Sequence, residues 1–216
     1  MKKTKLLTTL GAVALIGAIG VGSTFAYLSD KTGTVTNTFT VGNVQFDEDL
    51  NGGLSESAVK KDTNGNYVRD TGKNKWTEDH AEYKDIVAGS TLYKDPTVHI
   101  AEGSEECWVF AKIENNNANL KIEYSPDWTD VTDAYCNAKG IDSKTANYVV
   151  YAKTSTIPGN PTEEQRHSTI FTEVKVDSNI TGETEFTPIN VSACAVQAAG
   201  FANYDAENLL KEVAFN

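Results

Sequence analysis

The stretch from Cys107 to Ile113 places the strongest constraint on the fold. Apolar residues at alternate positions are interleaved with Trp108, Phe110 and Lys112, so both faces of a strand here are largely apolar. Such a strand is expected at the middle of a sandwich sheet, because an edge or half-exposed strand carries polar residues on one face. The stretch therefore predicts a central strand of a β-sandwich.

Several other short segments share this period of two and are separated by turn residues. Further strands are predicted at residues 98–100, 120–124, 147–153, 170–176 and 188–197. Residues 125–145 are irregular, and Leu209, Leu210 and Val213 have the spacing of a short helix over 204–213. Because strands and helices do not alternate, the fold class is all-β: an antiparallel, jelly-roll-like β-sandwich with loop insertions and a short C-terminal helix.

Residues 47–90 have a different composition, with many turn formers and few large apolar residues. We expect an exposed insertion here, with a hairpin around Asn64-Gly65. Asp62 begins a segment that faintly resembles a calcium loop. An EF-hand is nevertheless excluded, because Tyr67 and Lys73 stand where that loop needs glycine and glutamate.

The first residues have the order of a secretory signal peptide. A basic head is followed by an uncharged, apolar stretch from Leu6 and then by small residues up to Ala26. Cleavage is predicted between Ala26 and Tyr27, and the alternative is a retained membrane anchor, since the run is long enough to span a bilayer. The predicted organisation is a signal peptide (1–26), an N-terminal strand (27–46) and a sandwich domain (47–216). The mature protein is expected to be secreted, in the extracellular matrix or at the cell surface.

The charge of the mature chain excludes one class of partner. Removing residues 1–26 takes away three lysines and no acidic residue, which leaves 16 basic and 30 acidic residues and a net charge of −14. A chain this acidic, without a basic cluster, repels phosphate backbones. Nucleic acid is therefore not an expected partner.

The chain has three cysteines, and none lies in the signal region. Outside the cytoplasm one pair can form a disulfide and leave the third thiol over. Cys107 and Cys194 are the candidate pair, with Cys136 left over, although the sequence alone does not decide the connectivity. There is no CxxC spacing, so neither a thiolate metal site nor a redox dithiol is expected.

No catalytic or metal-binding motif is present among the histidines and acidic residues. The chain lacks HExxH, GxSxG and phosphate-binding fingerprints. His99 and Glu102 form a weak H-x-x-E, but a strand end does not bring such side chains together as a helix does, so we interpret His99 as a surface histidine. Trp76 and Trp128 would mark a sugar or partner surface if they are exposed, but aromatic residues that lie in the core or anchor a loop are commoner. We predict no enzyme activity, no metal and no cofactor.

The N-terminal strand is the feature that most directly suggests a function. Its β-branched and aromatic residues alternate, with a glycine that predicts a bulge. The side chains expected to fill alternate pockets are Val35, Phe39, Val41, Val44 and Phe46. Once freed by cleavage, such a strand can pair within its own sheet or add to the edge of a neighbouring copy. The second arrangement does not close on itself and propagates as a fibre.

The segments Ser23–Asp30 and Asn37–Val44 resemble the TasA/camelysin family of secreted matrix proteins of Gram-positive bacteria. Lys94–Val109 and Ile189–Phe201 are similar to its clostridial-type members. The resemblance implies processing by a SipW-type signal peptidase and a jelly-roll domain that forms biofilm fibres by donor-strand exchange. It implies that other copies of the chain, and other matrix proteins, are partners. The name camelysin also implies a metalloendopeptidase, for which this sequence has no zinc motif.

Three hypotheses follow. The first is a non-catalytic structural protein that self-assembles into extracellular matrix or biofilm fibres. The second is a cell-surface metalloendopeptidase, and the third is a monomeric accessory or anchoring module. Polymerisation of the purified chain distinguishes the first from the third, and inhibition by a chelator would favour the second.

Overall fold

The protein is built mainly of β-strands in three sheets, and the computed structural model describes residues 29–31, 44–78 and 81–215. The first sheet has, in spatial order, the strands β1 (Ser29–Lys31), β13 (Asn190–Gln197), β7 (Cys107–Glu114), β10 (Val149–Lys153) and β9 (Trp128–Asp130). The second has β3 (Val59–Lys61), β4 (Tyr67–Arg69), β5 (Thr91–Tyr93), β12 (Phe171–Val176) and β8 (Leu120–Tyr124). The third has β11 (His167–Thr169), β6 (Thr97–His99) and β2 (Leu54–Ser55).

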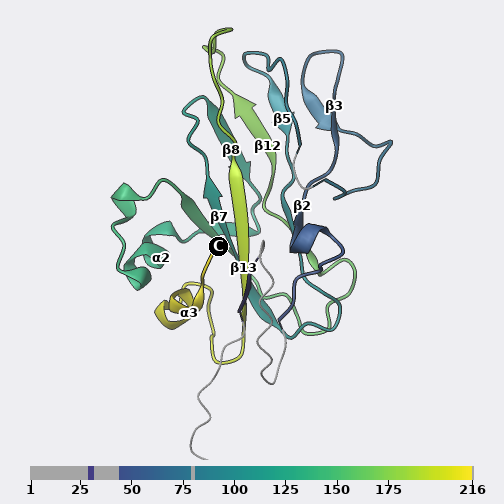
Figure 1. The fold of residues 1–216 in the computed structure, drawn as a ribbon. Coiled ribbons are helices and arrows are strands. Elements are labelled where there is room, and N and C mark those ends of the chain that lie inside the picture. The colour runs from purple at the N-terminus through teal and green to yellow at the C-terminus, as the bar shows by residue number, and fades with distance from the viewer. Residues whose placement is uncertain (1–28, 32–43, 79–80, 216) are drawn as a thin grey trace, which may run out of the picture.

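The predicted all-β sandwich is confirmed. The described strands pair antiparallel, apart from the parallel contact between β4 and β5. Two helices, α2 (Thr132–Lys139) and α3 (Glu207–Glu212), lie together beside the sheet that contains β7 and β13 (Figure 1). Two short 3-10 turns, η1 (Asn51–Gly53) and η2 (Ser143–Thr145), complete the described elements.

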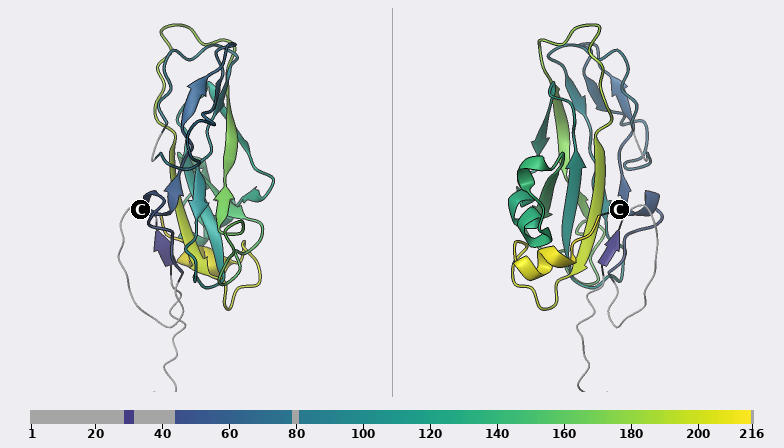
Figure 2. Two further views of the ribbon diagram at one scale, coloured as in Figure 1. Left: turned by 90° about the vertical axis from the view of Figure 1, so that its right-hand side faces the viewer. Right: turned by 60° about the vertical axis from the view of Figure 1, so that its left-hand side comes forward.

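Strand β7 is buried on both faces, as its sequence predicts. Val109 and Ala111 belong to the hydrophobic core that the three sheets share. Trp108 and Phe110 face the other way, into a second core that is covered by α2 and α3. The same alternation holds in β13, and the turned views in Figure 2 show the helices on one face of this sheet. The helices are therefore the third layer that a sheet with two apolar faces needs.

The alternation also corrects the candidate disulfide. The register pairs Cys107 with Gln197 and Cys194 with Phe110. Since side chains alternate along a strand, the two thiols point to opposite faces of the sheet, one into each core. All three cysteines are buried and none forms a disulfide. The prediction of a Cys107–Cys194 bridge was wrong.

The C-terminal helix is confirmed, and the other helix was not predicted. Leu209 and Leu210 of α3 are buried in the second core. Helix α2 lies in the segment expected to be irregular and ends at Gly140, which has a left-handed φ of 69°. Lysine followed by glycine, as in Lys139-Gly140, is a recognisable helix end, so the sequence did contain a signal for this helix.

The segment 47–90 is more integrated than its composition indicates. Strands β3 and β4 form the hairpin predicted around Asn64-Gly65. Residues 53–58, however, are buried or half-buried, and β2 pairs with β6. The expectation of an exposed insertion was therefore wrong for residues 53–58, because backbone pairing with β6 draws a segment with few large apolar residues into the sandwich.

Turn η1 fixes the approach of this segment to the core. Gly52 and Gly53 have φ values of 70° and 90°, which favour glycine. A Cβ atom on Gly53 would lie 2.3 Å from the Cβ of buried Phe46, whereas one on Gly52 would meet nothing within 4 Å. A substitution at Gly52 therefore adds backbone strain alone, whereas a substitution at Gly53 adds both backbone strain and steric overlap with Phe46.

We predict that Gly53→Ala destabilises the protein much more than Gly52→Ala. Gly52→Ala adds only a strained backbone, at about 1–2 kcal/mol, whereas Gly53→Ala also forces Phe46 out of its position in the core. Urea unfolding of both variants and the wild type measures the difference. Equal losses of unfolding free energy in the two variants would show that Phe46 can move aside without destabilising the core.

Candidate functional site

The outer edge of β13 is the first candidate site. Strand β1 pairs antiparallel with it, opposite residues 194–196, with Ser29 facing Val196 and Lys31 facing Cys194. On its other side, every residue of β13 from Asn190 to Gln197 pairs with β7. Within the described residues, β1 is the only strand beyond β13 in this sheet. An edge that is covered by so short a strand can accept another strand in its place.

The predicted donor strand is only partly described. Ala26, Tyr27, Val35, Phe39 and Val41 lie outside the described residues. The two remaining positions, Val44 and Phe46, are 3% and 4% exposed and pack in the core of the chain's own sandwich.

Phe46 also forms a β-bridge with Ile100, far from β13 in the sheet order. Because removal of these side chains would open the hydrophobic core, we limit the exchangeable segment to the residues before Val44.

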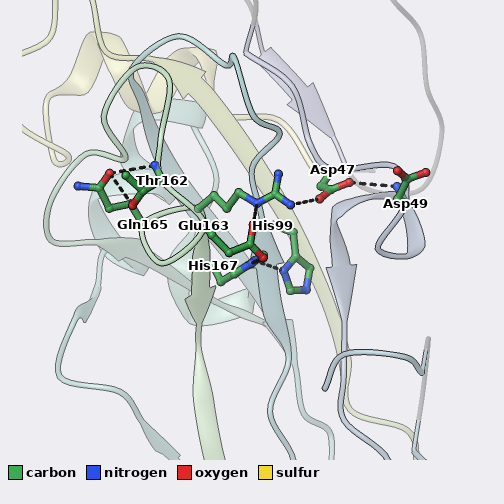
Figure 3. A network of polar contacts seen from close by, with 8 residues as sticks. Asp47, Asp49, His99, Thr162, Glu163, Gln165 and His167 are labelled. Carbon is green, nitrogen blue, oxygen red and sulfur yellow. Dashed lines mark hydrogen bonds and ion pairs between the residues drawn. The ribbon is translucent and has the colours of Figure 1, made fainter. Parts of the chain in front are cut away.

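The second candidate site is a chain of polar contacts on β2, β6 and β11. His99 is 0% exposed, and its Nε2 lies 2.8 Å from Ser55 Oγ. Its Nδ1 lies 2.7 Å from Nδ1 of His167 on the neighbouring strand. His167 Nε2 in turn lies 3.1 Å from Glu163 Oε1. Figure 3 shows how His99, His167 and Glu163 lie relative to one another. The four side chains form one continuous relay.

Only one proton arrangement satisfies this relay while both imidazoles are neutral. The ionised Glu163 carboxylate only accepts hydrogen bonds, so His167 Nε2–H donates to it. The neutral His167 then accepts at Nδ1 from His99 Nδ1–H, and His99 Nε2 accepts from the Ser55 hydroxyl. Burial first, and then the facing His167, lower the pKa of His99 from 6.5 to about 3. His99 is therefore held neutral near pH 7.

The relay is closed off by an aromatic ring and by ion pairs. The ring of Trp76 lies over both imidazoles, with centroid distances of 5.1 Å to His99 and 4.5 Å to His167. Trp76 has a φ of 58°, which is unusual for a large side chain. Arg166 forms ion pairs with Glu163 at 2.9 Å and with Asp47 at 3.1 Å, which tie the relay to the turn before η1.

These contacts limit the chemistry of His99. Both of its ring nitrogens are hydrogen-bonded, so neither offers a lone pair to a metal ion while the relay is intact. Glu102 is exposed and does not join the relay. In the part of the chain that the structure describes, no group of three or more His, Cys, Asp or Glu side chains is placed to hold a metal.

One prediction about a single residue was wrong. His99 is buried rather than on the surface, because β6 lies between β2 and β11 and Trp76 covers it. Trp128 is buried, as the commoner interpretation of this residue expects, and donates from Nε1 to the carbonyl of Thr169 at 3.0 Å. The His99–His167 contact joins residues 68 positions apart, and no local pattern marks it.

A scan against protein-family models, a search of curated proteins and a search of solved structures each returned no match to this chain. Across residues 29–31, 44–78 and 81–215, no helix is long and apolar enough to cross a membrane.

The depressed pKa of His99 predicts a loss of stability in mild acid. Unfolded His99 takes up a proton below pH 6.5, whereas the folded chain resists until about pH 3. The unfolded state thus binds more protons between these values, so this contribution is complete above pH 6.5 and falls as the pH is lowered. From pH 7 to pH 5 the loss is about 2 kcal/mol.

Urea unfolding between pH 7 and pH 5 measures this loss. The variant His99→Asn is expected to be less stable at pH 7 and to lose less stability on acidification, because the titrating group is gone. If the free energy of unfolding falls equally with pH in the variant and the wild type, this account of His99 is contradicted.

Proposed function

We propose that the chain is an exported structural protein that self-assembles into extracellular matrix fibres by exchanging its N-terminal strand between copies. The observation that carries this proposal is the place of β1. It pairs at the edge of the first sheet, and its only strand partner among the described residues is β13.

Exchange of this strand requires no new kind of contact. A neighbour's residues 29–31 offer the same main-chain groups to β13 as the chain's own, so the ladder in a fibre reproduces the ladder within one chain. Residues 32–43 connect β1 to the sandwich, and a connection of this length spans at most about 40 Å when extended. The contact is head-to-tail, and head-to-tail contacts that do not close produce filaments.

The sequence supports the other parts of the proposal. The basic, apolar and small-residue order of residues 1–26 supports export, and the resemblance to the TasA/camelysin family supports a SipW-type signal peptidase, other copies of the chain and other matrix proteins as partners. The metalloendopeptidase alternative is less well supported, because His99 has both ring nitrogens engaged. The accessory-module alternative is decided by the experiment below.

We predict that purified residues 27–216 form fibres visible by electron microscopy, and that a chain starting at Gly42 does not. The shorter chain lacks β1 but keeps the core residues Val44 and Phe46. It should remain folded by circular dichroism, because β1 contributes only an edge strand of three residues.

A cross-link shows whether the strand passes between copies. One chain carries Ser29→Cys and a second carries Val196→Cys, at positions that face each other in the register. Oxidation of the mixture should give disulfide-linked dimers, and the double variant in one chain is the control for geometry. Fibres from both lengths, or cross-links that form only within one chain, would contradict strand exchange. Monomers from both lengths would favour the accessory module.

A further inference from the structure

The sandwich contains a cavity that the proposed function does not use. Its volume is about 500 Å³, within the range of roughly 300–1,000 Å³ typical of small-molecule sites. Most of the wall is apolar and includes Leu92, Leu120, Val174, Ile86 and Phe186.

One part of the wall carries two buried charges. Glu56 and Lys94 both line the cavity, and their side chains are only 8% and 11% exposed. The ammonium group of Lys94 pairs with Oε1 of Glu56. The other carboxylate oxygen, Oε2, is buried and has no hydrogen-bond partner. A buried carboxylate oxygen left without a donor is costly, so this atom indicates a missing partner.

The nearby buried carboxylate of Asp95, in contrast, has hydrogen-bond donors for both of its oxygens. Asp95 accepts from the backbone N–H and the hydroxyl of Ser57, at 2.7 and 2.8 Å, and from the hydroxyl of Tyr93 at 3.0 Å. Tyr83, which lines the cavity, directs its hydroxyl to the carbonyl of Tyr93 at 2.7 Å. Burial and the charges of Glu56 and Asp95 raise its pKa, so it remains a neutral donor that is already in use.

We propose that the cavity binds a neutral, largely aliphatic alcohol. Its hydroxyl group donates to Glu56 Oε2 and accepts from the Lys94 ammonium, and its alkyl chain lies against the apolar wall. A hydroxyl is both donor and acceptor, so one group serves both members of the ion pair.

The charge balance selects a neutral molecule. Glu56 and Lys94 together carry no net charge, and burial of an additional unpaired charge beside them is strongly unfavourable. An alkylammonium ion adds a second cation near Lys94, and an alkyl carboxylate adds a second anion near Glu56. Both should therefore bind more weakly than the alcohol of the same chain length.

Titration calorimetry of residues 27–216 with 1-octanol, octylammonium and octanoate at pH 7 tests the proposal. We expect saturable binding of 1-octanol that is at least about tenfold tighter than binding of either ion, as expected for a buried hydrogen bond to a charged group. Equal affinities for the three probes, or no saturable binding of 1-octanol, would overturn it. In the second case the cavity holds only water.

Two variants and one control locate the binding. The double variant Glu56→Leu/Lys94→Met removes both charges together, which proteins often tolerate, and should weaken 1-octanol binding about tenfold. Ile86→Trp fills the cavity and should abolish binding. Glu173→Gln on the exposed side of β12 is the matched control and should bind 1-octanol as the wild type does.

Unchanged binding of 1-octanol in both cavity variants, with folding confirmed by circular dichroism, would place the alcohol elsewhere. The titration measures binding of a small alcohol and the electron microscopy measures assembly, so failure of one proposal is distinguishable from failure of the other.

Discussion

The ladder between β7 and β13 is the interaction on which the rest of the structure depends. Eight residue pairs join the two strands, and both strands present apolar side chains to both faces of their sheet. One face is buried against the other two sheets and the second against α2 and α3. Because a sheet with two apolar faces must be covered twice, this ladder determines the sandwich and the position of the helices.

The same ladder leaves β13 one sheet position from the edge. Only β1 lies beyond it in the described chain, and β1 is three residues long. A strongly held strand with a weakly covered outer edge combines a stable domain with a surface that can accept another strand. The proposed assembly and the stability of the domain therefore depend on opposite sides of one strand.

The His99 relay and the cavity beside Glu56 differ in whether their buried polar atoms have hydrogen-bond partners. In the His99 relay, each ring nitrogen of the two imidazoles has a hydrogen-bond partner, and the relay ends at the ionised Glu163 carboxylate. At the cavity, Glu56 Oε2 has no partner. A satisfied network indicates a structural role, while an unsatisfied buried oxygen beside a cavity indicates a place for a ligand.

The sequence by itself determined the parts of the fold that local periodicity controls. The strands β7, β8 and β12, the hairpin at Asn64-Gly65 and the helix α3 all lie where the pattern of apolar and turn residues places them. These elements are predictable because a period of two or of 3.6 is a property of neighbouring residues. Helix α2 carried a readable end at Gly140 but lacked a clear apolar period.

Only the tertiary structure decided which distant residues meet. The sheet order brings His99 to His167 and Glu56 to Lys94, and the register sends Cys107 and Cys194 to opposite faces. None of these outcomes follows from spacing along the chain, because strand order and register depend on how the complete apolar surface is buried. The burial of His99 and Trp128 has the same cause: strands and loops far away in the sequence cover them.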